Sequence, residues 1–297
     1  MVAPELDGAK TFMDAVTAAG IPLAIGHSEA DAACVADAVR RGARIAVHLC
    51  DATGTAISPS RWEGTLEVSF DVACMLQKEL GLPEDTPCFD LNAACTGFVY
   101  ALHTMECLLN AAPRKFGLVV GGEALSRVVD WTDRSTCILF GDGAAAAVVE
   151  CREGWPSIGA VLGSRGDDTL LRLPGLGRGE AGVLSMEGTR VFKFAVETVP
   201  ACISAVLAKS RLTAEDIDFF VFHQANARII DLAAKKYHIP PEKYYKNIQK
   251  YGNTSAASIP LVISELHDLG KVGPGSRVLV VGFGGGLTWG SALIEFA

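Results

Sequence analysis

Short apolar runs alternate along this chain with longer, Ala-rich runs in which apolar residues recur at helical spacing. The first set comprises an apolar strand over 21–27, a helix over 28–43 and a second strand over 44–49. Ser28 can cap the helix and Gly42 can close it. This pattern predicts a β–α–β unit whose two strands lie side by side and parallel.

A second series of elements follows a stretch without periodicity. Residues 51–65 are rich in Gly, Ser, Thr and Pro, so they are predicted to be a linker. Beyond them the pattern predicts helices over 68–81, 96–112, 191–210, 227–237 and 253–270. It predicts strands, some running into turns, over 87–95, 116–123, 144–151, 219–226 and within 277–296. Alternation of this kind is typical of α/β folds with parallel-rich sheets covered by helices.

Composition and charge narrow the class of protein. Of 297 residues, 49% are hydrophobic and 20% are charged, which excludes a disordered chain. A net charge of −8 argues against a general nucleic-acid binder, which needs a basic field. The nine cysteines include no CxxC pair, which favours a reducing compartment. The first residues lack the pattern of a signal peptide, and five glycines interrupt the most apolar stretch, 277–296, so we expect a cytoplasmic protein without a membrane span.

Cys95 is the first candidate for chemistry. It lies in DLNAACTGF, between a predicted strand and a predicted helix. The positive end of that helix favours the thiolate, so we expect a lowered pKa and a nucleophile. The small neighbours Ala93, Ala94 and Gly97 leave room for a substrate. A buried structural cysteine is the alternative interpretation.

Three further segments carry polar groups at places where elements end. His223 follows an apolar strand, and Asn253 begins a predicted helix. A structural histidine and an ordinary helix cap are the alternatives for these two residues. The glycine-rich run 282–290 offers backbone N–H groups that can hold an oxyanion. It does not fit a dinucleotide site, because no helix follows it.

Taken together, these segments resemble the ketoacyl-ACP synthase III family of the thiolase superfamily. The resemblance covers about residues 66–297. It rests on AACTGFVYAL (93–102), LFGDGAAAAVV (139–149), GTRVFKFAV (188–196), HQANARII (223–230), KYGNTSAASIP (250–260) and GFGGGLTWGSALI (282–294). It implies a thiolase-like layered αβαβα fold, with a nucleophile half at about 66–160 and a His/Asn half at about 161–297. It also implies a homodimer.

The same resemblance implies an activity and a site. The Cys–His–Asn triad of the family falls on Cys95, His223 and Asn253, and the oxyanion would be held by the N–H groups of Cys95 and Gly285. Condensing enzymes of chain elongation use Cys–His–His, and plant-type polyketide synthases carry GFGPG in place of GFGGG. The implied reaction condenses acyl-CoA with malonyl-ACP and initiates fatty acid synthesis without a metal or organic cofactor.

Basic residues complete the implied site. Arg134, Asn226 and Arg228 match family positions near the CoA entrance. Lys193, Arg228, Lys235 and Lys236 match the patch that meets acyl carrier protein. On a chain of net charge −8, a local basic patch can steer an acidic partner. A solvated pair of lysines on a helix face is the alternative.

The front of the chain departs from this family. Residues 1–65 lack the aromatic and the arginine that sandwich the CoA adenine in the family. Residues 3–52 instead resemble a fragment of N-acetylglucosamine-6-phosphate deacetylase of the amidohydrolase superfamily, with the metal-binding histidines falling on His27 and His48. The third ligand and the catalytic Asp are absent, so we expect no metal site. The chain is therefore interpreted as a chimera, and an inactive truncated synthase or a metal-dependent deacetylase stay open as alternatives.

Overall fold

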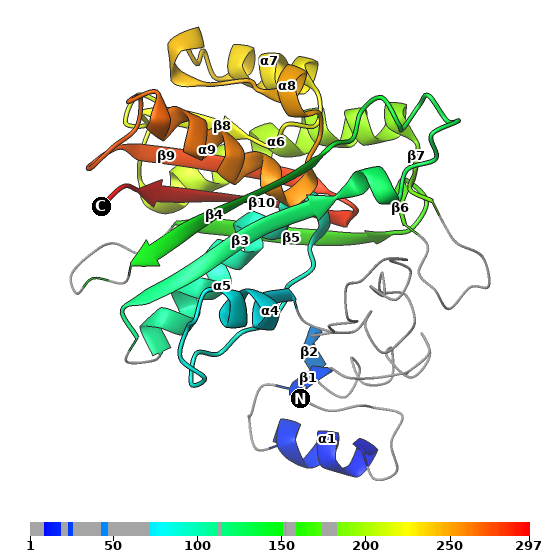
Figure 1. Cartoon of the computed structure of the whole chain (residues 1–297), viewed down its shortest axis with the longest axis vertical. Coiled ribbons are helices and arrows are strands. Elements are labelled where there is room, and N and C mark those ends of the chain that lie inside the picture. The colour runs from blue at the N-terminus through cyan, green and yellow to red at the C-terminus, as the bar shows by residue number, and fades with distance from the viewer. Residues whose placement is uncertain are drawn as a thin grey trace. The chain divides into compact units, whose positions relative to one another are not determined.

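The computed structural model of the chain (Figure 1) describes residues 9–18, 23–25, 43–46, 72–111, 114–150, 152, 159–173 and 183–297. The chain forms two compact units. The described residues up to Asp90 belong to the first, and Leu91–Leu173 and Val183–Ala297 form the second. The boundary expected at residue 65 lies outside the described residues and stays a prediction.

The first unit contains α1 (Ala9–Ala18), β1 (Leu23–Ile25), β2 (Ala43–Ala46) and α4 (Val72–Glu79). β1 pairs with β2 in parallel, so the predicted parallel pairing of the two strands is confirmed. The helix predicted between them lies outside the described residues, apart from Ala43, which is in β2. The predicted linker 51–65 and both histidines considered for a metal, His27 and His48, also lie outside the described residues.

The strand predicted over 87–95 is wrong. Residues 87–93 form no ladder, and Asp90 instead caps α4. Its carboxylate accepts the backbone N–H groups of Val72 at 2.8 Å and Ala73 at 2.9 Å, which are two free donors of the first helical turn. The apolar pattern of this segment therefore could not indicate that it serves a helix end rather than a sheet.

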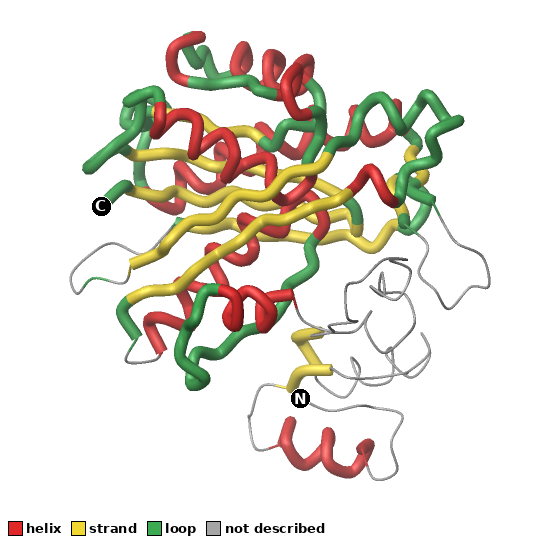
Figure 2. The backbone as a smooth tube through the Cα atoms, viewed as in Figure 1, coloured by secondary structure: helices red, strands yellow, loops and turns green. Residues whose placement is uncertain are grey.

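The second unit is layered. A four-stranded sheet has the order β5 (Ala160–Asp167), β10 (Gly286–Glu295), β9 (Arg277–Gly284) and β8 (Phe219–Phe222). The helix α6 (Gly188–Ser210) covers one face, with α7 (Ala227–Lys236) packed against it. The helices α5 (Gly97–Ala111) and α9 (Ser258–Asp268) cover the other face (Figure 2). Beyond them lies a ribbon of β3 (Phe116–Ala124) and β4 (Asp142–Glu150).

Short elements connect these layers. They are η2 (Ala94–Thr96), η3 (Leu125–Arg127), β6 (Leu171–Arg172), β7 (Ser185–Met186), η5 (Pro241–Lys243), α8 (Ile248–Tyr251) and η6 (Ser255–Ala257). Two of them, η2 and η6, carry or adjoin the candidate catalytic residues and contact each other. Within the described residues the order is helix, sheet, helix, ribbon, which is four of the five layers of the expected αβαβα arrangement.

The central strands are apolar on both faces because both faces are buried. Along β8, Phe220 and Phe222 join the core cluster under α6 and α7, whereas Phe219 and Val221 join the cluster under α5 and α9. Strand β9 divides in the same way. Since successive strand residues point to opposite faces, one apolar run supplies two cores.

Two predictions about this unit are wrong. The sheets are not parallel-rich, since only β8 and β9 pair in parallel among its described strands. β9 leads into β10 almost directly and β3 reaches β4 without a crossover helix, so both pairs must be antiparallel. The helix predicted over 253–270 is interrupted: α9 begins only at Ser258, after the 3-10 turn η6. Ser255 in that turn has φ +47°, which an α-helix cannot contain.

The helix α6 is long and apolar enough to cross a membrane by length and composition. It is instead a core helix of this unit, because its apolar residues pack in the cluster beside β9 and β10. The buried ones are Phe194, Ala195, Val199, Pro200, Cys202, Ile203, Val206 and Leu207.

Candidate active site

Cys95 is the middle residue of η2, and α5 begins two residues later, at Gly97. The turn that presents it is tight, since Ala94 has φ +48°. Strand β10 holds the turn in place, because Thr288 Oγ1 donates to the carbonyl oxygen of Ala93 at 3.0 Å. Gly284 closes over it: a Cβ there would lie 2.8 Å from the backbone nitrogen of Cys95. The thiol is thus fixed where a glycine-rich strand end meets a helix start, and only 6% of the residue is exposed.

The expectation of a lowered pKa for this thiol is wrong. Burial raises the pKa of Cys95 to about 12, and the nearby Glu123 carboxyl raises it further. The hydrogen bond from the Ser255 side chain lowers the pKa, but by less than burial raises it. A helix N-terminus stabilises a thiolate by a limited amount, and loss of water costs more in this site. Cys95 is therefore a thiol at neutral pH in the unliganded protein.

His223 directly follows β8 and is almost completely buried, with 2% exposed. Its backbone N–H donates to Val281 O at 2.9 Å, which continues the β8–β9 ladder by one residue. Its ring Nδ1 lies 2.6 Å from Ser258 Oγ at the start of α9, and its ring packs edge-on against Phe283. Burial lowers the pKa of His223 to about 3, so the imidazole is neutral at physiological pH.

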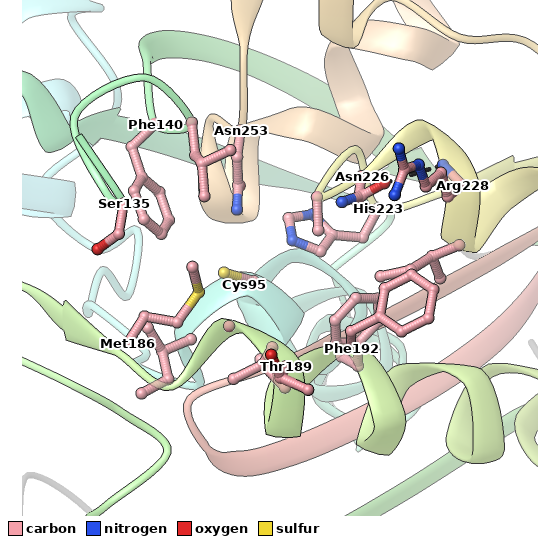
Figure 3. Close-up of a pocket in the computed structure, with 18 residues that line it drawn as sticks. Cys95, Ser135, Phe140, Met186, Thr189, Phe192, His223, Asn226, Arg228 and Asn253 are labelled. Atoms are coloured by element: carbon pink, nitrogen blue, oxygen red, sulfur yellow. Dashed lines mark hydrogen bonds between the residues drawn. The ribbon is translucent and has the colours of Figure 1, made fainter.

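Asn253 is held by its backbone and its side chain. Its N–H donates to Leu139 O at 2.8 Å, and its carbonyl accepts the Gly141 N–H at 3.0 Å. Its Oδ1 accepts the Ser255 N–H at 2.9 Å. With Oδ1 in use, the amide nitrogen Nδ2 is the free end, and Figure 3 shows it directed into the space that Cys95 and His223 also face.

One cavity of about 370 Å³ contains all three residues in its wall. Its lining is mostly apolar, with Leu139, Phe140, Met186, Phe192 and Phe283 around the three polar side chains. The structure therefore brings together side chains that lie 128 and 30 positions apart along the chain. A cysteine with two amide- or imidazole-type donors in an apolar pocket suits covalent capture of an acyl group and stabilisation of a developing oxyanion.

The other predicted residues lie in the cavity wall, beside it or outside it. Asn226 and Arg228 line the same cavity, and Asn226 caps α7 by accepting the Arg228 N–H at 2.9 Å. Arg134 is exposed, beside Ser135 of the cavity wall. Lys193 on α6 and the pair Lys235 and Lys236 on α7 are exposed and lie outside the cavity lining. Gly285 lies alongside Ala94, with its neighbour Gly284 in the cavity wall.

Four residues around the site escaped the sequence interpretation. Ser258 contacts His223, Thr288 holds the cysteine turn, and Ser255 and Glu123 act on the Cys95 thiol. Three of the four stand inside blocks that had already been recognised. Glu123 carried its own signal, since it is the one acidic residue in the apolar strand FGLVVGGEA.

No group of three or more His, Cys, Asp or Glu side chains within the described ranges is arranged to hold a metal ion. The candidate site is built from a thiol, an imidazole and an amide.

Comparison with known proteins covers most of the second unit. A family model described as 3-oxoacyl-[acyl-carrier-protein] synthase III matches residues 89–166, and the model of the C-terminal part of that enzyme matches residues 207–296. The chain is 45% identical over 235 residues to a β-ketoacyl-[acyl-carrier-protein] synthase III of Clostridium acetobutylicum, covering 76% of this chain and 72% of the relative. It is 46% identical over 219 residues to the enzyme of that name from Lactococcus lactis, covering 70% and 67%.

Solved structures agree. The 3-oxoacyl-[acyl-carrier-protein] synthase III of Aquifex aeolicus superimposes with a TM-score of 0.71 at 40% identity, over 79% of this chain and 74% of that one. The priming β-ketosynthase of the R1128 polyketide pathway superimposes with a TM-score of 0.72 at 34% identity, over 78% and 72%.

Proposed function

This chain belongs to the 3-oxoacyl-[acyl-carrier-protein] synthase III family, and from that premise we propose that it condenses an acyl-CoA starter with malonyl-ACP by decarboxylation, initiating fatty acid synthesis. The observation that carries the proposal is the shared cavity of Cys95, His223 and Asn253. It gives the acyltransferase its nucleophile and two donors without a cofactor.

In the first half-reaction, Cys95 takes the acyl group. The Cys95 thiol loses its proton as the sulfur attacks the thioester carbonyl of acyl-CoA. The bond to the CoA sulfur then breaks, and the CoA sulfur takes up one proton, so that the exchange of thiols conserves protons. The N–H groups of Cys95 and Gly285 stabilise the oxyanion of the tetrahedral intermediate. The close contact of Gly284 with Cys95 supports this arrangement, since it brings the glycine run against the nucleophile.

The hydrogen bonds of Ser258 define which nitrogen of His223 faces the substrate. Ser258 Oγ accepts the Gln224 N–H at 3.3 Å, which leaves its hydroxyl hydrogen free for Nδ1 of His223. We infer that Nδ1 accepts this hydrogen and that Nε2 carries the ring proton. The neutral imidazole is then a hydrogen-bond donor toward the cavity, as its lowered pKa permits.

In the second half-reaction, malonyl-ACP loses CO2. The carbon–carbon bond to the carboxylate breaks, and its electron pair becomes an enolate on the thioester. Nε2 of His223 and Nδ2 of Asn253 donate to the enolate oxygen, where charge develops only in this step. The carbanion attacks the acyl-Cys95 carbonyl, and the cysteine leaves as the ketoacyl product forms.

Surface residues support the proposed partners. The phosphates of CoA would be held by Asn226 and Arg228, which line the cavity, and by Arg134, which precedes Ser135 of the cavity wall. Exposed Lys193, Lys235 and Lys236 would meet the acidic carrier protein. We also propose a homodimer, because Phe116, Val120 and Val148 leave an apolar surface on the β3–β4 ribbon. We propose that it is cytoplasmic, since the nine cysteines include no CxxC pair.

Mass spectrometry tests the proposal. Acyl-CoA should add one acyl group to Cys95, and malonyl-ACP should then remove it and release a ketoacyl-ACP. Cys95→Ala should abolish both signals. An intact wild-type protein that forms no adduct with acetyl-CoA or longer straight- and branched-chain acyl-CoAs would refute the proposal.

The absence of a recognised adenine-binding segment in residues 1–65 favours a second candidate, a non-catalytic homologue. The acyl-Cys95 adduct separates the two, and calorimetric titration measures how strongly CoA still binds. We expect CoA to bind about tenfold to a hundredfold more weakly than to a relative with the aromatic–Arg sandwich, because stacking of that kind contributes on the order of 1–3 kcal/mol. Binding with no adduct would favour the non-catalytic homologue.

A further inference from the structure

His223 and Asn253 must reach one enolate oxygen in the proposed reaction, yet they come from separate elements. His223 follows β8, and Asn253 follows α8 after a single glycine. A group that is displaced by about 1 Å loses much of its effect on the transition state. The two segments therefore need contacts that set the distance between them.

Gln224, the residue after His223, ties the end of β8 to the segment that leads into α8. It is 1% exposed. Its Nε2 donates to Phe222 O at 2.8 Å and to Tyr245 O at 3.4 Å, and its Oε1 accepts the Asn247 N–H at 3.1 Å. Since the carbonyls can only accept and the backbone N–H can only donate, the orientation of this amide is defined. The buried side chain thus fixes the start of α8 relative to His223.

Glu265 on α9 holds both ends of α8. Its Oε2 accepts Asn247 Nδ2 at 3.0 Å, just before α8, and its Oε1 accepts the hydroxyl of Tyr251, the last residue of α8, at 2.8 Å. Lys250 Nζ, from a side chain 62% exposed, donates to the same Oε1 at 2.8 Å. Burial alone would raise the pKa of Glu265, but its three hydrogen bonds lower it below the ordinary value, so the group is a carboxylate. A helix of four residues has little stability of its own, so these bonds anchor it.

The helix α9 contacts the segments of both donors through one face. Ser258, its first residue, lies against Nδ1 of His223 at 2.6 Å. Glu265 comes seven residues later, which is about two helical turns, so the two side chains share a face. Only Gly252 separates the end of α8 from Asn253. One helix face therefore carries a contact for each donor.

We propose that Glu265 is a positioning residue for decarboxylation, which through α8 sets the place of Asn253 beside His223. This inference rests on the proposed function. Glu265 lies outside the described lining of the cavity, and no bond or proton changes at it. Its effect falls on the second half-reaction, because acylation uses the thiol of Cys95 and the backbone N–H groups around it.

Glu265→Ala tests this role in the full-length protein. Loss of the carboxylate releases both ends of α8, so fully acylated enzyme should decarboxylate malonyl-ACP about tenfold more slowly. We expect the loss in kcat, with the KM for malonyl-ACP changed by less than about twofold. Acylation of Cys95 by acetyl-CoA should also stay within about twofold, whereas partial unfolding would lower both half-reactions equally.

Glu265→Gln supplies the rescue. Its amide oxygen can accept the Tyr251 hydroxyl, and its NH2 group can donate to the Asn247 side chain once that amide turns its oxygen toward it. Decarboxylation should therefore stay within about threefold of wild type. Asp268→Ala, on the same helix, is the matched control and should behave as wild type, because its side chain is 77% exposed and lies 3.8 Å from His267.

Tyr251→Phe removes one of the bonds from the partner's side. It should slow decarboxylation in the same direction as Glu265→Ala. The double variant should be no slower than Glu265→Ala alone, since both changes break the same contact. Additive losses would overturn the proposal, because Tyr251 would then act independently of Glu265.

Hydrogen exchange followed by mass spectrometry examines the contact without substrate. Glu265→Ala should speed exchange in the peptide that spans 247–253 and leave the peptides of β8 and β9 unchanged. Glu265→Gln should exchange like wild type. Unchanged exchange over 247–253 in Glu265→Ala would show that Glu265 does not hold this segment, and it would overturn the proposal.

The remaining outcomes separate this inference from the proposed function. Wild-type protein that takes up no acyl group contradicts the function, and the inference falls with it. In an active wild type, decarboxylation by Glu265→Ala within about threefold of wild type overturns the positioning role alone. A Glu265→Gln variant as slow as Glu265→Ala also overturns it, because the negative charge and not the hydrogen bonds would then be required.

Discussion

His223 and Asn253 differ from Cys95 in what each is free to do. In the proposed reaction Cys95 supplies the atom that forms a covalent bond. Each of the other two residues has one polar atom bound to protein and one directed at the cavity. A donor that is fixed before reaction stabilises charge without reorganisation. Its benefit falls on the step in which that charge appears.

Alanine variants of these two donors should therefore slow one half-reaction much more than the other. We expect His223→Ala and Asn253→Ala to slow decarboxylation of malonyl-ACP by about a hundredfold or more, since removal of one oxyanion donor has an effect of that order. Acylation of Cys95 should fall much less. The rate of CO2 release measures decarboxylation, and the mass adduct measures acylation of Cys95. Equal losses in both steps would assign His223 to activation of the thiol.

The same histidine gives the protein a pH signature. Its pKa is about 3 in the folded state against 6.5 as the ordinary value, so the unfolded chain binds the extra proton between these limits. Stability present above pH 6.5 is therefore lost as the pH falls toward 3. From pH 6.5 to 4.5 this group should lower the free energy of unfolding by about 2 kcal/mol.

Denaturant unfolding of wild type and His223→Gln at pH 6.5 and 4.5 measures that loss as a difference. Glu123, with its raised pKa, acts in the opposite direction but equally in both proteins. The lowered carboxylates Asp130, Asp133 and Asp167 titrate below this range. Parallel changes in the two proteins would contradict a buried neutral His223.

At the scale of elements, two turns decide the site. One is η2, held between Thr288 and Gly284, and the other is the segment between α8 and η6, which carries Asn253. Residues 139–141 clamp this second segment through two backbone hydrogen bonds. The contact is close: a Cβ on Gly141 would lie 2.1 Å from the Tyr251 carbonyl oxygen.

Gly141→Ala should therefore displace Asn253 without touching the cavity. We expect decarboxylation to fall at least tenfold, with a smaller effect on Cys95 acylation, because a displaced donor misses the enolate oxygen. Thermal unfolding should also shift downward. Gly273→Ala is the control, since its Cβ would meet open space, and it should leave both rates unchanged. Wild-type decarboxylation in Gly141→Ala would show that the clamp does not position Asn253.

At the scale of the whole molecule, the net charge is negative but one region of the surface is basic. The chain carries a formal charge of −8, yet Lys193, Arg228, Lys235 and Lys236 all lie on α6 and α7. The two lysines in the last turn of α7 are also favoured there by the helix dipole. A basic patch on an acidic protein directs an acidic partner to one face.

Reversing two of these charges should weaken binding of the carrier protein without affecting binding of acyl-CoA. We expect Lys235→Glu with Lys236→Glu to raise the KM for malonyl-ACP about tenfold at low salt, and less at 0.5 M salt, where screening shortens the range of the interaction. The KM for acyl-CoA should not change. Lys271→Glu, an exposed lysine outside α6 and α7, is the control. If Lys271→Glu raised the KM for malonyl-ACP equally, the effect would come from the net charge of the protein and not from a local patch.

The sequence by itself determined the fold class and most element positions, and it predicted the three candidate catalytic residues that the structure places around one cavity. Apolar runs on β8 and β9, helical spacing on α6 and α7, and the blocks around Cys95, His223 and Asn253 are local properties that a chain displays before it folds. The parallel pairing of β1 and β2 followed from the same local pattern.

Tertiary structure alone decided the direction of strand pairing, the pKa values of Cys95 and His223, and which residues contact them. The antiparallel pairs depend on which connections lack a crossover helix, and the break before α9 depends on a turn that packs against β3. The pKa of Cys95 is raised and that of His223 is lowered because burial removes water from both, which sequence position next to a helix could not indicate. Ser255, Ser258 and Glu123 gain their roles from contacts between segments 30 to 160 positions apart, and such contacts exist only once the layers have packed.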